Sequence, residues 1–525
     1  MVFYIFFIFL LFSWYVGTEY RREGLDFESD ITVMRALKGD FWSVLISNAS
    51  PTTHYSIPYG GWPPLHTIIH YFFAILGLSI PFARLITNIL LIISFGIIVM
   101  VIVKKISQSA DHILALMLAI LSPALVNQIS LGVRHIIIPF AAVIPLLLLI
   151  YFRASYIYYV ITAFICFIIG FSDWHAYSFL FALTFILLVS IIFPINSFFK
   201  NIDKRELIYF LIISGSGFLS AFILYKYLYY WYISKNLINS LFIIEGASIN
   251  KLFYQTQLSG KILLMAIVFT LVRIGFASLP LLFIIIFIIY NNKGQIKIEK
   301  DRLSILILLL SIIAPILFSL IFRSQVHQPY HDFEILAFIA LVALISSQLY
   351  IPQRNKNLVR IFSILLIVLL NIIFLNLWRI LPDKYLISHQ YSNQQLYHLP
   401  LEPGDYDISS TTSQINEVII IKSILRQIAS LPINDNRLIK LNPYFGSINY
   451  FRIYADDLKK EIMEDEIIII YGKKNWWELS YSFFTERVFM GVANKLQFQK
   501  LVRDLKNKYG DNIKIALIIP KKPII

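Results

Sequence analysis

Cysteine is almost absent from this sequence, because Cys166 is the single example among 525 residues. One thiol cannot close a disulfide within the chain, and it cannot supply the repeated ligands of a zinc finger. The chain also lacks a Walker loop, a dinucleotide fingerprint and a Ser-centred nucleophile elbow. The commonest signatures of disulfide-stapled domains, nucleotide-binding enzymes and serine hydrolases are therefore missing.

Charge is scarce as well. Charged residues make up 14% of the chain and hydrophobic residues 58%, whereas soluble domains carry roughly 25% charged residues. Apolar runs such as residues 85–103 and 303–322 are long enough to cross a hydrocarbon core as helices. The composition therefore predicts a polytopic membrane protein with the lipid bilayer as its main partner.

The net charge of +14 does not indicate nucleic-acid binding. Lys and Arg gather in short loops, such as 291–302 and 351–360, and cytoplasmic loops of membrane proteins collect these residues. The N-terminal apolar segment, residues 1–18, has no basic region before it and no small-residue cleavage site. We expect it to be a retained first helix.

Twelve apolar segments up to about residue 378 predict a bundle of about 11–13 membrane spans. The composition then changes, and residues 379–525 alternate short apolar strands with polar helices. "DEIIIIYG" and "IKIALIIP" are typical of buried strands, and "FQKLVRDLKNKYG" of an amphipathic helix. The predicted fold class is mainly α, a transmembrane helical bundle at 1–378 followed by a small soluble α/β domain at 379–525.

The basic loops predict the orientation of most segments. If 291–302 is cytoplasmic, the C-terminal domain is extracytoplasmic. The loop at 19–62 is ambiguous, because segment 63–78 is short and opens with two prolines. If that segment crosses the bilayer, loop 19–62 is cytoplasmic, and if it does not, the loop is outside.

Loop 19–62 opens with three carboxylates, Asp26, Glu28 and Asp30. A helix would place Asp26 and Asp30 on one face, where their repulsion raises one proton affinity or recruits a cation. Either outcome suits a base that deprotonates an acceptor hydroxyl. The alternative is a solvated loop in which Asp30 caps a helix over "ITVMRALKG".

Three further clusters carry groups that bind phosphate or polar ligands. "YGGWPPLHTIIH" (residues 59–70) is accounted for by a sharp turn into the bilayer. Two pairs, Arg134–His135 and Asp173–His175, lie in loops predicted to be external. An Arg side chain can bind phosphate, and Asp and His can ligate a metal. Anchoring at the membrane interface explains each pair alone. "FRSQVHQPYHDFEIL" (residues 322–336) is either a phosphate-binding loop or a connector.

Together these motifs resemble the GT-C glycosyltransferases, polytopic enzymes that use polyprenyl-phosphate sugars. The resemblance covers roughly residues 1–350 and is carried by "FESD", "KGDFW", "WPPL", "LGLSIPFARL", "LSPALVNQISLGVRH" and "HQPYHDFE". It implies an extracytoplasmic acidic loop and one early segment that does not cross. It also implies that Asp30 is the catalytic carboxylate, with Glu28 or Asp26 as the runner-up.

The resemblance implies transfer of a sugar from a polyprenyl-phosphate donor to an extracytoplasmic acceptor, with inversion at the sugar if attack is in line. The high content of Ile, Lys and Asn favours an A/T-rich genome and a bacterial inner membrane. The candidate donor-phosphate residues are Arg134, His135, Arg323, His327 and His331, and the resemblance itself covers this role only for those in "HQPYHDFE". The candidate substrate-binding residues are Asp173, His175, Trp62 and His66. Glu-Ser-Asp replaces the adjacent Asp-Glu pair of many members, so no cofactor is certain and a divalent metal stays open. The alternatives are a lipid-linked saccharide flippase and a non-catalytic relative.

Overall fold

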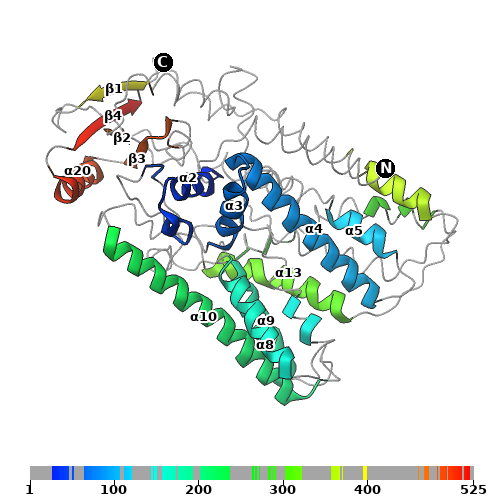
Figure 1. Ribbon diagram of the computed structural model, residues 1–525. Helices are drawn as coiled ribbons and strands as arrows, with labels where there is room; N and C mark the ends of the chain where they lie inside the picture. The colour runs from blue at the N-terminus through cyan, green and yellow to red at the C-terminus, as the bar shows by residue number, and fades with distance from the viewer. Residues whose placement is uncertain are drawn as a thin grey trace.

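The structure is a computed structural model of the chain (Figure 1). It describes residues 26–46, 50–52, 64–106, 111–120, 156–172, 175–192, 202–236, 302–321, 356–366, 394–398, 466–471, 485–492, 495–510 and 513–520, with scattered positions at 144–149, 260–290, 369, 459 and 482. These residues are mostly helical and include one small sheet. This confirms the predicted mainly α fold class with a small sheet, while the number of spans and the domain bounds stay predictions.

Except for the first two, which lie in loop 19–62, the helices before the sheet follow the apolar segments of the sequence. They are α2 (Asp26–Leu37), the short 3-10 helix η1 (Phe41–Val44), α3 (Leu65–Ile75), α4 (Ile80–Ile106), α5 (His112–Ile120), α8 (Tyr156–Gly170), α9 (His175–Ile192), α10 (Lys204–Asn236) and α13 (Arg302–Ile321). The two longest are α4 and α10, and Figure 1 shows α10 along the lower left edge, beside α8 and α9.

Two helices in the described part of the chain are long and apolar enough to cross a membrane. Ile80–Lys105 and Lys204–Trp231 contain 26 and 28 residues, with mean hydropathies of 2.8 and 2.2. At 1.5 Å per residue they extend about 40 Å, more than the roughly 30 Å hydrocarbon thickness. Large apolar side chains, such as Ile97 and Ile212, lie exposed on both helices, as lipid-facing surfaces require.

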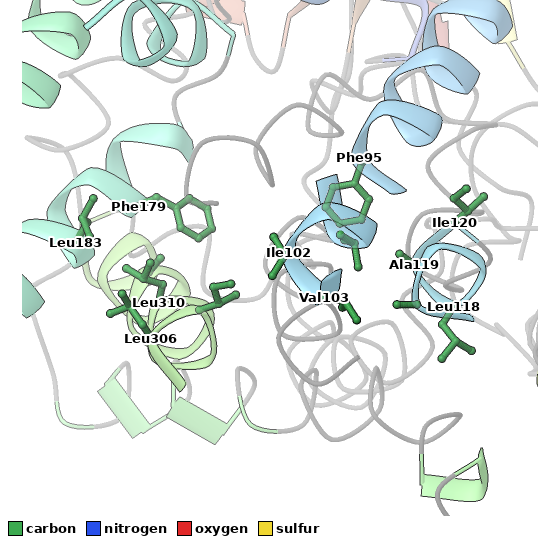
Figure 2. Close-up of a cluster of buried hydrophobic side chains, with 14 of the residues drawn as sticks. Phe95, Ile102, Val103, Leu118, Ala119, Ile120, Phe179, Leu183, Leu306 and Leu310 are labelled. Atoms are coloured by element: carbon green, nitrogen blue, oxygen red, sulfur yellow. The ribbon is translucent and has the colours of Figure 1, made fainter. Parts of the chain in front are cut away.

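The main core draws most of its side chains from α4, α5, α9 and α13, with further members from α8 and α10. Figure 2 shows buried side chains from α4, α5, α9 and α13 that belong to one cluster, among them Phe95, Ile102, Leu118, Phe179 and Leu310. A second contact joins α8 to α10 through small residues. A Cβ on Gly217 would meet the backbone carbonyl of Ala163 and the side chain of Cys166, so glycine there allows the close helix approach typical of membrane bundles.

The C-terminal sheet has the strand order β1-β4-β2-β3. Its strands are β1 (Gln394–His398), β2 (Glu466–Tyr471), β3 (Val488–Val492) and β4 (Lys514–Pro520). β2 is parallel to β3 and β4, and β1 pairs antiparallel with β4. Helix α20 (Lys495–Tyr509) buries Phe498, Leu501 and Leu505. The two strands and the helix predicted within 465–520 are confirmed.

Candidate active site

The acidic stretch forms the start of a helix, as its spacing predicts. α2 runs from Asp26 to Leu37 and is followed by Gly39 at a φ of 109°, a left-handed residue of the kind that commonly ends a helix. Because the helix begins at Asp26, Asp30 lies in its second turn and does not cap a helix over "ITVMRALKG". That alternative is wrong. The side chains of Asp26 and Glu28 lie outside the described residues.

α3 and α4 form a tight helical hairpin beside α2. α3 ends at Ile75, and Gly77 turns the chain with a φ of 90° before α4 begins at Ile80. The 11 residues of α3 rise about 16 Å, roughly half of the hydrocarbon thickness. α3 is therefore too short to cross a membrane by itself.

Asp30 and Arg84 form an ion pair between α2 and α4. Arg84 Nη1 donates to Asp30 Oδ2, and the two residues are 0% and 2% exposed. Asp30 Oδ1 is also buried and accepts no hydrogen bond from any residue that the structure describes. A buried charge is tolerated where it is paired, so Arg84 stabilises the ionised carboxylate while one of its oxygens remains available.

His70 of α3 makes polar contacts with residues near both members of this ion pair. Its Nδ1 lies 2.8 Å from Ser29 Oγ, and its Nε2 lies 2.8 Å from the Ile80 carbonyl oxygen and 4.0 Å from Asp30 Oδ1. A carbonyl oxygen only accepts, so Nε2 carries a hydrogen and donates it to Ile80. In the neutral ring Nδ1 then accepts from the Ser29 hydroxyl.

His66 joins α3 to α4 one turn further along. Its Nε2 lies 2.9 Å from Asn88 Oδ1, and its ring centroid is 6.4 Å from that of His70. The interior between α2, α3 and α4 is therefore lined by polar side chains.

The end of α2 is fixed by a second buried arginine. Arg35 Nε donates to Asp40 Oδ2 at 2.6 Å, and Arg35 Nη1 donates to the Thr52 carbonyl. Asp40 belongs to the "KGDFW" element, and Trp42 of the same element lies 4.9 Å from Trp231 of α10, measured between ring centroids. These contacts attach the acidic loop to the C-terminal end of α10.

A surface ion pair joins α2 to the sheet domain. Lys38 Nζ lies 2.7 Å from Glu486 Oε2. The hydrogen bond from Lys38 lowers the pKa of the Glu486 carboxyl, and partial burial opposes this shift. A lowered pKa means that the stabilisation is complete above the unfolded pKa and disappears as the pH falls through the folded pKa. Both side chains are about 40% exposed, so the pair is worth less than about 1 kcal/mol.

The structure describes only two predicted site side chains, Asp30 and His66, and brings both into the same polar interior. The others are outside the residues whose side chains are described: Asp26, Glu28, Trp62, Arg134, His135, Asp173, His175, Arg323, His327 and His331. No group of three or more His, Cys, Asp or Glu suited to a metal occurs among the described residues.

Sequence reasoning did not select Arg84, His70 or Ser29 as site residues. An ionisable residue inside an apolar segment is a functional candidate by default, and Arg84 meets this criterion near the start of α4. His66 and His70 are four positions apart and share a helix face. This spacing is a second signal in the sequence that indicates a polar site.

Comparison with solved structures gives the fold. The chain is similar to the crystal structure of ArnT from Cupriavidus metallidurans bound to undecaprenyl phosphate, with a TM-score of 0.50, 11% identity, and coverage of 96% of this chain and 88% of that chain. The apo structure of the same protein gives a TM-score of 0.48 with 12% identity, covering 96% and 87% of the two chains.

The fold is GT-C-like. This confirms the resemblance drawn from the loop motifs, for the fold alone. No protein-family model and no curated protein matches the sequence. At 11% identity the GT-C-like fold does not carry residue roles with it, so the roles below depend on the geometry of this chain.

Proposed function

We propose that this protein is an integral membrane glycosyltransferase that moves a sugar from a polyprenyl-phosphate donor to an extracytoplasmic acceptor. The GT-C-like fold supports this class of reaction, and one of the similar structures holds undecaprenyl phosphate. The observation that carries the proposal for this chain is the Asp30–Arg84 pair, a buried carboxylate with one committed oxygen and one uncommitted oxygen.

In the proposed reaction Asp30 is the general base. The acceptor hydroxyl gives its proton to Oδ1 while its oxygen bonds to the sugar's anomeric carbon. The bond from that carbon to the phosphate oxygen breaks, and polyprenyl phosphate leaves with inversion at the sugar. A base must lie within about 3 Å of the oxygen that carries the proton it takes. Because Oδ1 is buried, neighbouring groups must move when the acceptor binds.

The leaving phosphate gains negative charge, so preorganised cationic donors stabilise the transition state. Arg134, Arg323, His327 and His331 remain our proposed donors, together with His135. Asp173, His175, Trp62 and His66 remain proposed substrate contacts. Of these four, His66 lies within hydrogen-bond distance of Asn88. Glu28 and Asp26 remain alternatives to Asp30 as the base.

The charges at the two ends of α4 and α10 support an extracytoplasmic site. Arg84 near the start of α4 contacts α2, and Trp231 near the end of α10 contacts η1. The opposite ends carry Lys104 with Lys105 and Lys204 with Arg205, each about 30–40 Å away along its helix. Basic residues favour the cytoplasmic side, so the acidic loop belongs outside and the protein is multi-pass with an external C-terminal domain.

The direct test is transfer of radiolabelled sugar from polyprenyl-phosphate donors to candidate acceptors by purified protein. We expect D30N to lose at least about 1000-fold of the rate, the scale of a missing general base. D203N makes the same chemical change at an exposed residue before α10 and should keep full activity. Label that crosses the bilayer while still on the lipid would instead indicate a flippase, and equal rates for D30N and wild type would remove Asp30 from the chemistry.

A further inference from the structure

His70 has no part in the transfer chemistry above, although it touches the neighbours of both charged groups. Its ring is fully buried and bridges Ser29 to the Ile80 carbonyl. Ser29 directly precedes Asp30, and Ile80 lies one helical turn before Arg84. The ring therefore spans from the residue beside the carboxylate to the turn of α4 that carries the arginine.

We propose that His70 is a positioning residue that sets the geometry of the Asp30–Arg84 pair and carries no proton during the reaction. This inference rests on the proposed function. Both ring nitrogens are already in use, because Nε2 donates to Ile80 and Nδ1 accepts from Ser29. Nε2 is 4.0 Å from Asp30 Oδ1, beyond hydrogen-bond distance. The His70 ring therefore has no vacant nitrogen that could receive the proton from Asp30.

The direction of the His70 N–H decides which Asp30 oxygen reacts. The N–H is committed to the Ile80 main chain, so the ring does not occupy Oδ1, and Arg84 holds Oδ2. Oδ1 is then the oxygen that meets the acceptor. Without the bridge, α2 and the start of α4 lose a shared contact, and a displacement of about 1 Å can cost roughly 100-fold in rate.

The charged and titratable groups described around the ring are Asp30 from α2, His66 from α3 and Arg84 from α4. A positioning residue should change the rate at every pH without changing the shape of the pH–rate profile. A proton carrier would remove one limb of that profile when it is replaced.

The test compares H70Q, S29A and the double variant S29A/H70Q with T67V. Thr67 shares helix α3 and full burial with His70, and its hydroxyl has no partner among the described residues, so T67V is the matched control. All rates are measured per folded protein from the monodisperse size-exclusion peak, with the labelled polyprenyl-phosphate sugar that the wild type uses.

We expect H70Q to lower kcat about 10–100-fold with KM for the donor within about twofold of wild type, and T67V to match wild type. S29A/H70Q should be no slower than H70Q, because both changes break one bridge. Loss of a pH limb, or H70Q indistinguishable from T67V, would overturn the positioning role while leaving the proposed function intact. A wild-type protein that transfers no sugar would overturn the proposed function itself.

Discussion

At the scale of single residues, the molecule places two opposite charges in its interior. Removing two ions from water is costly, and a buried pair recovers that cost only when both members are present. Asp30 and Arg84 meet this condition, and their neighbours Ser29, His66 and His70 supply further polar contacts. Ionisable groups among apolar helices are costly, so a cluster of this kind indicates a functional site.

This pairing predicts the consequence of losing Arg84. In R84Q the Asp30 carboxylate is left buried without its counter-charge, which should cost about 3–5 kcal/mol of unfolding free energy. D30N/R84Q removes both charges and should recover part of that loss. Thermal unfolding in detergent measures both effects. An R84Q protein that unfolds at the wild-type temperature would show that the two residues are not paired.

The sequence predicted Asp30 but not the complete site, for a geometric reason. Residue types and spacing indicate which carboxylate opens the loop, and helical periodicity places Asp26 and Asp30 on one helix. Arg84 and His70 are 54 and 41 positions away from their partners on α2. Only the hairpin of α3 and α4, turned at Gly77, brings them together, and periodicity does not determine how two helices pack.

At the scale of helices, hydropathy located the elements well. The apolar runs at 85–103 and 303–322 correspond to α4 and α13, because an apolar run must form internal hydrogen bonds when it lies in lipid. Hydropathy could not say that α8 packs on α10, since lipid and a neighbouring helix are equally apolar. That contact depends on small residues.

The α8–α10 contact gives a matched pair of substitutions. G217A places a Cβ against the Ala163 carbonyl and should cost about 1–3 kcal/mol, because a backbone atom cannot move aside easily. G215A lies two residues away, where an added Cβ meets nothing within 4 Å, and should leave stability near wild type. Unfolding temperatures that fall equally for both variants would contradict this packing.

At the scale of the whole molecule, the acidic loop, the end of α10 and the sheet domain meet at one end. Lys38 and Glu486 are 448 positions apart in sequence and in contact. A cytoplasmic sheet domain would be incompatible with an external loop. If the acidic loop is external, as proposed, this contact requires the sheet domain, predicted at residues 379–525, to lie outside as well.

Cross-linking tests that arrangement. K38C/E486C should join rapidly with a short bis-maleimide, and the single native thiol, Cys166, is buried. K204C/E486C is the control, because Lys204 begins α10 about 40 Å from Trp231, and it should not join. Efficient joining of the control pair, or none in the first pair, would mean that the sheet domain lies elsewhere.

The most direct test of the proposed mechanism is a structure of this protein with undecaprenyl phosphate bound. The mechanism predicts that the phosphate lies at the end of the bundle that holds Asp30 and Arg84, in a cavity that Asp30 Oδ1 also faces. A phosphate bound at the opposite end, beside Lys105 and Lys204, would contradict it.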